Sequence, residues 1–156
     1  MKRINIDREW YLDTRQSGIN SFRNVKECRV VNLPHDLMIE TDVSPDAKSG
    51  RASGYYKGSL ACYTKYITLP EDLKDHRILI EVDGAYMNTE VYCDGNFVKR
   101  HPYGYTPFHA DITPYVRFGS ETRIQIIVNN EMPYTSRWYT GTGIYRHVDL
   151  LTAPYV

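Results

Sequence analysis

The chain has 156 residues, of which 42% are hydrophobic, and this length and composition suit one domain with a single core. Lysine and arginine together number 19, as do aspartate and glutamate, so the formal net charge is zero. Because no net field attracts phosphate or anionic lipid, nucleic acid and membrane surfaces are excluded as partners. No run approaches the roughly 18 apolar residues of a membrane span, which predicts a soluble chain.

The cysteines and the aromatic residues narrow the class further. Cys28, Cys62 and Cys93 are odd in number and widely spaced, which fits neither a disulfide framework nor a zinc site. They are predicted to be buried or half-buried thiols, and no metal or other cofactor is expected. Aromatic residues make up 13% of the chain, including 14 tyrosines. Tyrosine is typical of β-sheets and of surfaces whose partner is partly apolar and partly hydroxylated.

Alternation at period two recurs along the chain, whereas helical periodicity is nearly absent. A short apolar run, Arg29–Leu33, is followed by a polar stretch, Glu40–Gly58, that is predicted to be an exposed loop. The next two alternating segments are Leu60–Leu69 and His76–Asp83. The second of these places Ile78, Ile80 and Val82 on one side, as expected of a half-buried strand.

The second half of the chain continues the pattern. Thr89–Val98 is predicted to be a hairpin, because Asp94-Gly95 favours the tight turn that matches strand twist. Thr122–Val128 and Tyr145–Leu151 are further strands, and Asp111–Val116 is predicted to form one helical turn. Seven or eight short strands separated by turns indicate an all-β fold, a mostly antiparallel β-sandwich or jelly roll within a single domain.

Two stretches are denser in aromatic residues, glycine and polar groups than a simple connection requires. They are His101–Phe108 and Tyr134–Arg146. Loops on a rigid sandwich commonly carry function, and this is one interpretation. The other interpretation, which the residues leave open, is that these aromatic side chains only cover the open ends of the sandwich.

Several motifs invite a catalytic interpretation that their context does not support. Gly141 and Gly143 lack the third glycine and the strand-to-helix transition of a dinucleotide site. His35 and Asp36 are adjacent, so on an extended chain they point to opposite faces, and hydrogen bonding within their own loop is expected. Four acidic residues could neighbour one another. Their positions are typical of solvent-exposed strand residues or of a turn, so no catalytic residue is assigned among them. These four are Glu81, Asp83, Glu90 and Asp94.

Seven motifs in series resemble the N-terminal domain of glycoside hydrolase family 2, in order and in spacing. They are Val31–Asp36, Tyr63–Pro70, Val82–Gly95, Arg100–Phe108, Asp111–Thr113, Val128–Asn130 and Ser136–Val148. The resemblance covers nearly the whole chain from about Trp10 onward and is closest to bacterial β-galactosidases, although β-glucuronidases and β-mannosidases share the domain. Cys62 departs from the family, which more often has tryptophan before that tyrosine.

The resemblance implies a galactose-binding-domain-like jelly roll spanning residues 1–156, with an immunoglobulin-like domain and a catalytic barrel following in the parent enzyme. A barrel alone needs about 250 residues, so this chain is expected to be catalytically silent. The parent enzyme is expected to be a retaining β-glycosidase, with β-galactoside the leading substrate. The family also implies a bacterial cytoplasmic or periplasmic location.

The resemblance also implies roles for individual residues. Asn130 occupies the position at which such galactosidases place an aspartate or asparagine that reaches the sugar, and an amide can donate to and accept from hydroxyls. Other substrate-binding candidates at the pocket rim are Arg137, Trp138, Tyr103 and Tyr105. The residues expected to be structural are His35, Asp36, Gly141, Gly143 and Arg146, the last by hydrogen bonding to carbonyl groups.

Three functions follow as hypotheses from these features. In the first, the domain supports the barrel and completes the rim of the sugar pocket, so that its partners are the other domains of the same enzyme and a carbohydrate. In the second, it is an autonomous lectin-like module that stacks sugars on Tyr103, Tyr105, Trp138 and Tyr139. In the third, it is a structural or dimer-forming domain, and a homo-oligomer is left open.

Overall fold

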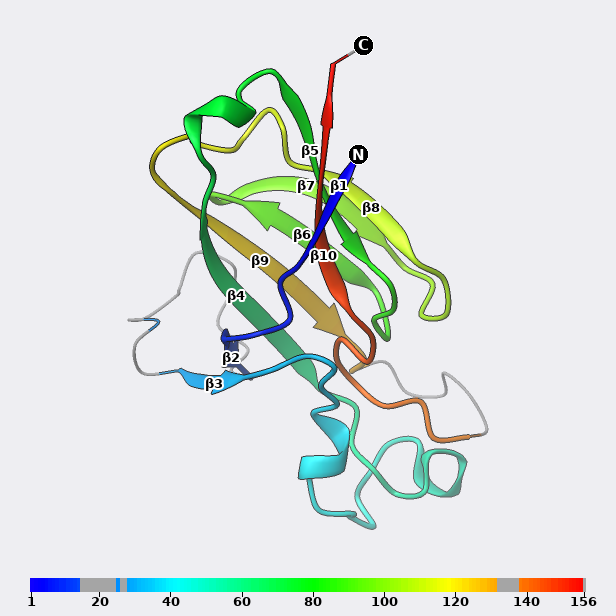
Figure 1. Ribbon diagram of the computed structural model, residues 1–156. Helices are drawn as coiled ribbons and strands as arrows, with labels where there is room; N and C mark the ends of the chain where they lie inside the picture. Colours follow the sequence, from blue (N-terminus) through cyan, green and yellow to red (C-terminus); the bar gives the residue numbers. More distant parts are fainter. Residues whose placement is uncertain (15–24, 26–27, 132–137, 156) are drawn as a thin grey trace.

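The computed structural model describes residues 1–14, 25, 28–131 and 138–155. Within them ten strands form two sheets that pack face to face (Figure 1). Every pairing between the named strands is antiparallel. The all-β antiparallel sandwich predicted from the alternation of the sequence is confirmed.

The smaller sheet has four strands and contains both ends of the chain. Its order is β1 (Lys2–Asn5), β10 (Val148–Pro154), β5 (His76–Val82) and β8 (Phe108–Asp111). Leu150 lies opposite Ile80, which in turn lies opposite Ala110, so an apolar row faces the core. The outer face is charged, and Arg3 pairs there with Glu81 and with Asp149.

The larger sheet has six strands. Its order is β3 (Arg29–Val31), β2 (Trp10–Asp13), β4 (Leu60–Thr68), β9 (Glu121–Asn129), β6 (Thr89–Cys93) and β7 (Asn96–His101). Tyr63 of β4 and Val91 of β6 both lie opposite Ile126, which fixes one apolar face toward the smaller sheet. Alternate residues therefore form the outer face of this sheet.

The core between the sheets has the composition that the alternation predicts. Its inward residues include Ile78, Ile80, Val82, Ile124, Ile126 and Val128, all without solvent exposure. The indole N–H of the buried Trp10 donates to the carbonyl oxygen of Ile6 at 2.8 Å, so this large side chain is buried without an unsatisfied polar group. No disulfide joins Cys28, Cys62 and Cys93; Cys62 and Cys93 are buried and Cys28 is half-buried, as predicted.

The predicted hairpin is confirmed, and its turn has the expected geometry. Asp94 and Gly95 have φ angles of 46° and 83°, the pair of positive values that a type I′ turn requires. The Asp94 carboxylate also accepts a hydrogen bond from the backbone N–H of Arg123 at 2.8 Å, which ties the turn to β9.

Other elements differ from the prediction. The strands β1, β2 and β8 were not predicted, because each has only 4 residues and shows too few alternations to be detected. The last strand runs over Val148–Pro154 rather than Tyr145–Leu151, because the backbone N–H of Arg146 bonds Gly84 and the Tyr145 hydroxyl bonds Gly104.

Short 3₁₀ helices replace part of the predicted loops. They are η2 (Met38–Glu40), η3 (Gly50–Ser53) and η4 (Glu71–Leu73). The segment that follows β8 forms a turn, in which Tyr115 and Val116 both donate to the carbonyl oxygen of Ile112. Among the described residues, none belongs to a helix long and apolar enough to cross a bilayer.

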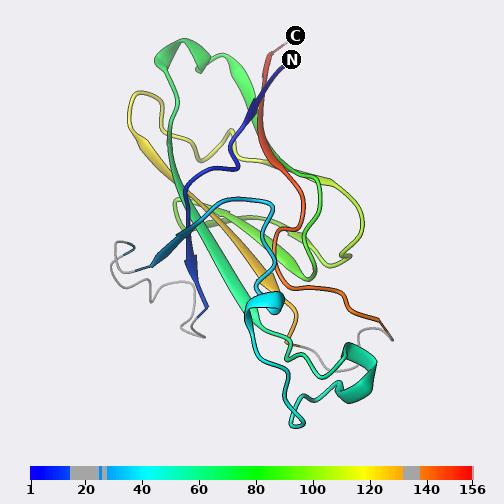
Figure 2. The ribbon, with the colours of Figure 1, turned by 60° about the horizontal axis from the view of Figure 1, so that its bottom comes forward.

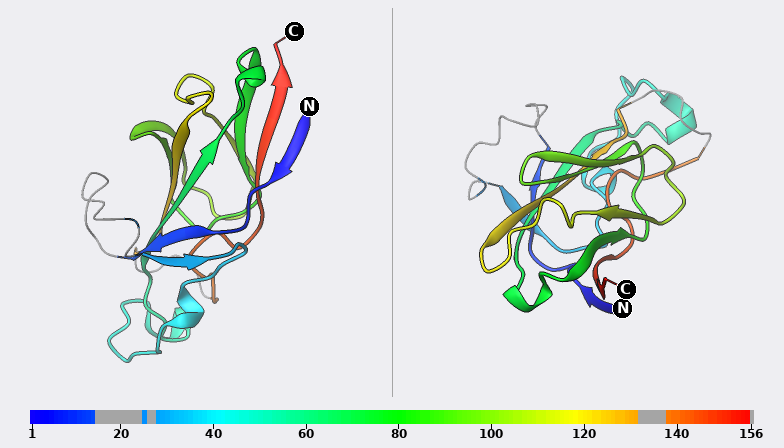
Figure 3. Two further views of the ribbon diagram at one scale, coloured as in Figure 1. Left: turned by 60° about the vertical axis from the view of Figure 1, so that its left-hand side comes forward. Right: turned by 90° about the horizontal axis from the view of Figure 1, so that it is seen from above.

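The two ends of the sandwich differ in what they carry. β1 and the end of β10 lie side by side at one end, at the top of Figures 1 and 2. The loops that contain η2 and η3 project from the opposite end, together with the segment that leads into β10, as Figure 3 also shows in side view. We call this opposite end, formed by residues 34–59, 102–107, 130–131 and 138–146, the loop end.

Candidate functional site

Asn130 occupies the centre of the loop end, directly after β9. Its side chain is 3% exposed, and its backbone N–H donates to the carbonyl oxygen of Ser59 at 2.9 Å. The amide Nδ2 donates to the Gly141 carbonyl at 2.9 Å and lies 3.1 Å from the Thr142 hydroxyl. Asn130 therefore braces the segment that leads into β10, a role that the sequence did not indicate.

The amide oxygen of Asn130 is in a different situation. No donor in the described part of the chain bonds Oδ1, although the amide nitrogen is fully used. An amide oxygen that no protein group bonds can accept a hydrogen bond from a ligand hydroxyl or from water. The geometry thus leaves one acceptor at the loop end for a hydroxyl group.

Asp36 connects two loops that are far apart in sequence. Its Oδ1 accepts from the backbone N–H of Met38 and of Thr142, each at 2.9 Å, and its Oδ2 accepts from the Tyr139 hydroxyl. Burial, and then the hydrogen bond to this carboxylate, raise the pKa of Tyr139, so the phenol stays protonated. The bond from Met38 lies within the loop of Asp36, and the bond from Thr142 joins that loop to the segment before β10.

Gly141 and Gly143 are required where they stand. A Cβ at Gly141, whose φ is +73°, would lie 2.8 Å from the Asp36 carboxylate. A Cβ at Gly143 would lie 2.4 Å from the Tyr63 hydroxyl and 2.7 Å from the carbonyl oxygen of His35. The glycine pair therefore allows the segment before β10 to approach the His35-Asp36 loop.

His35 points away from Asp36, as its adjacency predicts. Its Nδ1 lies 2.7 Å from the Tyr63 hydroxyl and its Nε2 lies 3.3 Å from Glu40. The backbone N–H of His35 donates to the carbonyl oxygen of Ile144 at 2.8 Å. Burial raises the pKa of Tyr63. Both members of the pair are thus parts of the loop framework.

Three exposed aromatic side chains form a group beside this framework. Trp138, Tyr103 and Tyr105 are 62%, 58% and 47% exposed, and we call them the aromatic cluster. The Trp138 indole N–H donates to the Tyr105 hydroxyl at 3.0 Å, and the rings of Tyr103 and Tyr105 meet edge to face at 5.6 Å. Sequence reasoning selected these residues, and the structure brings all three together.

A buried tyrosine packs against the aromatic cluster. Tyr86 is 4% exposed, and its ring meets that of Tyr105 at 5.2 Å. A Cβ at Gly104 would lie 2.2 Å from the Tyr86 ring, so only glycine fits between the two exposed tyrosines. Tyr86 is therefore buried against the cluster, whereas the three residues of the cluster are exposed.

Three residues for which the sequence predicted a role at the site do not show that role in the described structure. Arg137 lies outside the described residues. The Arg146 guanidinium is exposed and lies 3.5 Å from the Asp83 carboxylate, an ionic partner where carbonyl groups were expected. Tyr139, proposed as a stacking face, has its ring edge-on to Tyr56 at 5.4 Å and its hydroxyl on Asp36.

The acidic residues do not converge. Glu81 lies on the outer face of the smaller sheet beside Arg3, whereas Glu90 accepts a hydrogen bond from Tyr92 on the larger sheet. Asp94 pairs with Arg117 at 2.8 Å in the hairpin turn. The described residues also contain no group of three His, Cys, Asp or Glu side chains that could hold a metal ion.

The chain is similar in sequence to several known proteins. Residues 31–154 match the family model described as "Glycosyl hydrolases family 2, sugar binding domain". The chain is 39% identical over 146 residues to β-galactosidase BoGH2A of Bacteroides ovatus, covering 93% of this chain and 17% of that protein. It is 32% identical over 149 residues to a putative β-glucuronidase of Formosa agariphila, covering 94% and 14%.

Solved structures agree with this similarity. A family 2 glycosyl hydrolase from Bacteroides cellulosilyticus matches with a TM-score of 0.90 at 33% identity, over 99% of this chain and 21% of that one. A β-glycosidase from Bacteroides vulgatus matches with a TM-score of 0.89 at 32% identity, over 99% and 20%. The chain thus spans only a small part of the length of each relative.

Proposed function

The chain belongs to glycosyl hydrolase family 2, because residues 31–154 match its sugar-binding domain, and on this premise we propose that it is the non-catalytic N-terminal domain of a β-galactosidase-like enzyme. Its relatives include both a β-galactosidase and a putative β-glucuronidase, so the family alone leaves the sugar open. The galactosidase assignment is favoured by the higher identity, 39% against 32%.

In this proposal the catalytic groups belong to another domain of the parent enzyme. Retaining glycosidases use two carboxyl groups about 5 Å apart. Glu81, Glu90 and Asp94 lie on separate elements, and the neighbouring carboxylates of Glu81 and Asp149 are both paired with Arg3 on the outer face of the smaller sheet. The 156-residue chain on its own should therefore not hydrolyse a chromogenic galactoside. Turnover that survives stringent purification and scales with protein concentration would refute this part of the proposal.

We further propose that the loop end packs against the barrel and completes the rim of the sugar pocket. The observation that carries this is the amide oxygen of Asn130, which no described residue bonds. The Asn130 amide nitrogen bonds the segment before β10, and Asp36 joins that segment to the loop after β3. The exposed aromatic cluster belongs to the same loop end. β10 ends at the opposite end of the sandwich, so a polypeptide continuing from it leaves the loop end open to a domain further along the chain (Figure 1).

The role of Asn130 is tested in the parent enzyme by comparing Asn130→Ala with Asn96→Ala. Asn96 is an exposed hairpin residue far from the loop end and serves as the control. Loss of one hydrogen bond to a sugar hydroxyl costs about 1–2 kcal/mol, so kcat/KM for a nitrophenyl galactoside should fall by about 5- to 30-fold. Unchanged kcat/KM in Asn130→Ala would exclude contact between Asn130 and the sugar.

The aromatic cluster also favours a second candidate, an autonomous carbohydrate-binding module. Exposed tryptophan and tyrosine rings can stack on a pyranose without help from another domain. Titration of the isolated chain with galactose, lactose and glucuronic acid under NMR detection distinguishes the two. Shifts at Tyr103, Tyr105 and Trp138 that saturate at low millimolar sugar would favour the module, whereas their absence favours a rim that needs the barrel.

A contact surface is the third candidate, because the same exposed aromatic residues suit a protein interface. Light scattering on the isolated chain and on the parent enzyme tests it. Self-association of both would favour an oligomer built through this domain, and self-association of the isolated chain alone would show only that the barrel normally covers this surface.

A further inference from the structure

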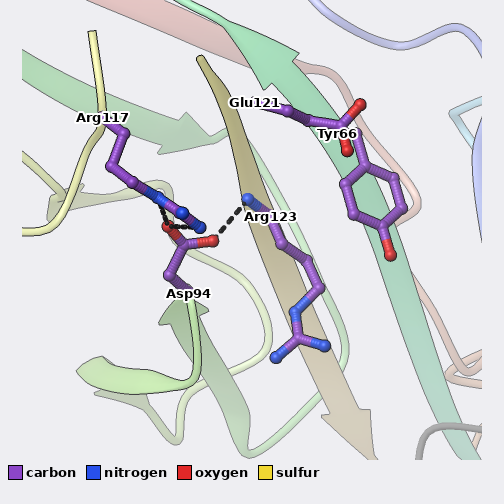
Figure 4. A pocket seen from close by; sticks show the side chains of 5 residues that line it. All are labelled: Tyr66, Asp94, Arg117, Glu121 and Arg123. Atoms are coloured by element: carbon purple, nitrogen blue, oxygen red, sulfur yellow. Dashed lines mark hydrogen bonds and ion pairs between the residues drawn. The ribbon is translucent and has the colours of Figure 1, made fainter.

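The outer face of the larger sheet carries a shallow groove that the proposed function does not use. It consists of two adjoining hollows that share Tyr66 and Glu121. The first is lined by Tyr66, Asp94, Arg117, Glu121 and Arg123 (Figure 4). The second is lined by Glu9, Tyr11, Val30, Lys65, Tyr66 and Glu121. We call the two together the outer groove.

The outer groove runs across the strands rather than along them. It begins at Val30 on β3, passes Tyr11 on β2 and Tyr66 on β4, and reaches Asp94 in the hairpin turn beyond β9. Four strand-to-strand spacings of about 4.8 Å, from β3 to the turn beyond β9, give a length of about 19 Å. A channel of this length suits an extended chain of several rings better than a single small molecule.

A pair of tyrosines forms the middle of the outer groove. The rings of Tyr11 and Tyr66 meet edge to face at 6.3 Å, and both side chains are half-buried, so each ring is held by its neighbour. Tyr66 lies directly opposite Arg123 in the pairing of β4 with β9. Figure 4 shows these two side chains extending in the same direction from adjacent strands, with Glu121 beside the tyrosine.

These groups match the chemistry of a sugar. A tyrosine ring offers a flat apolar surface for the C–H face of a pyranose and a hydroxyl at its edge. Carboxylates such as Glu121 accept from sugar hydroxyls, and the fixed fork of Arg117 or Arg123 donates to them. Both kinds of group flank the aromatic residues along the outer groove.

The charges along the outer groove balance. Lys65, Arg117 and Arg123 are matched by the same number of acidic residues, namely Glu9, Asp94 and Glu121. Within this balance the Asp94 carboxylate pairs directly with Arg117 at 2.8 Å, and it also accepts a hydrogen bond from the backbone N–H of Arg123. A polyanion such as nucleic acid needs a net positive field, so the balance favours an uncharged ligand.

We propose that the outer groove binds a neutral oligosaccharide of several pyranose rings, stacked on Tyr66 and Tyr11. This site is distinct from the pocket rim. Tyr66 lies six residues along β4 from Leu60, the residue opposite Asn129, which places it about 20 Å from the loop end. The domain would thereby hold a polysaccharide chain at a distance from the residue that is being cleaved.

The test is an NMR titration of the isotope-labelled 156-residue chain with β-1,4-galactobiose, β-1,4-galactotetraose and tetragalacturonate. The neutral tetrasaccharide should produce saturable shifts at Tyr11, Tyr66 and Arg123, with at least fivefold higher affinity than the disaccharide. Tyr66→Ala should weaken binding by at least tenfold. Glu121→Ala, at an exposed strand end, provides a second variant that leaves the core intact, and it should weaken binding by at least threefold.

Tyr155→Ala is the matched control, since it removes an exposed tyrosine that follows β10 and lines neither hollow, and it should leave the tetrasaccharide affinity unchanged. The inference is overturned if galactotetraose causes no saturable shift, or if its shifts are confined to residues 103–105 and 138–142. It is equally overturned if tetragalacturonate binds more tightly than the neutral chain. None of these outcomes bears on galactoside hydrolysis by the parent enzyme, which is measured separately.

Discussion

Asp36 shows how one side chain holds the loop end together. It accepts hydrogen bonds from Met38, Thr142 and Tyr139, and so joins the loop after β3 to the segment before β10. Hydrogen bonds to charged groups contribute about 1.5–3 kcal/mol each and are not additive, so Asp36→Ala should lower the free energy of unfolding by about 2–4 kcal/mol. Urea denaturation monitored by tryptophan fluorescence measures the change.

Asp83→Ala provides the comparison for Asp36, because it removes a carboxylate from an exposed ion pair with Arg146. Exposed pairs contribute little, so this substitution should cost less than about 1 kcal/mol. Equal losses in the two variants would mean that Asp36 does not connect the loops in solution.

Gly141 tests the close approach of those loops in a second way. Gly141→Ala places a Cβ 2.8 Å from the Asp36 carboxylate at a φ of +73°, whereas Gly50→Ala meets open space at a φ of +47°. Both variants carry the cost of a left-handed backbone, about 1 kcal/mol, and only the first adds a steric clash. Thermal unfolding should therefore show a clearly larger loss for Gly141→Ala, and similar losses would show that the loops do not touch.

Among the elements, the N-terminal segment is fastened to the start of β10 by a titratable pair. Asp7 accepts from the backbone N–H of Val148 at 2.8 Å and lies 2.6 Å from the His147 ring. Burial alone would raise the pKa of Asp7, but these hydrogen bonds outweigh it and lower the pKa. The hydrogen bond to Asp7 raises the pKa of His147.

These two shifts define a pH window for the stability of that attachment. The lowered pKa of Asp7 stabilises the fold above the unfolded value of about 4, and this is lost as pH falls through the folded value. The raised pKa of His147 stabilises the fold below about pH 6.5, and this is lost as pH rises through its folded value. The pair therefore contributes fully between about pH 4 and 6.5.

Urea midpoints of the wild type and of His147→Gln at pH 5.5 and pH 9 measure this contribution. The wild type should be the more stable protein at pH 5.5, and the difference should disappear at pH 9 because His147 is then neutral in both states. Asp7→Asn should remove the pH dependence in the same way. A difference between wild type and His147→Gln that stays constant with pH would show that packing, not charge, is responsible.

Local sequence predicted the long elements well and the short ones poorly. β4 and β9 each span nine residues, which is enough alternation to identify a strand and its buried face. The hairpin was predictable from Asp94-Gly95 alone, because few residues adopt two consecutive positive φ angles. β1 has four exposed residues and exists because β10 offers it an edge, which no local pattern encodes.

At the scale of the whole molecule, we expect the two sheets to unfold together in one cooperative step. The reactivity of the cysteine thiols measures whether they do. Burial raises the pKa of both Cys62 and Cys93 to about 12, so neither thiol ionises appreciably at pH 8. Cys28 is only half-buried. A disulfide reagent should modify one thiol quickly and the other two only through unfolding of the domain.

The labelling experiment follows the release of chromophore in native buffer and in sub-denaturing urea, with Cys28→Ser as the control that should lose the fast phase. Cys62 and Cys93 should share one rate that increases with urea as global unfolding does. Fast modification of either residue in native buffer would reveal local opening of the larger sheet.

The sequence by itself determined the strand class, the hairpin, the family resemblance and the residue types expected at the site. Those features depend on period, turn chemistry and motif order, which are local properties of the chain. Only the tertiary structure decided that Asp36 meets Thr142, 106 positions away, and that the Asn130 amide braces the same segment. It also decided that residues of four neighbouring strands and of one hairpin turn line two adjoining hollows. Strand order and loop contacts result from packing two whole sheets together, and that packing is a property of the complete fold.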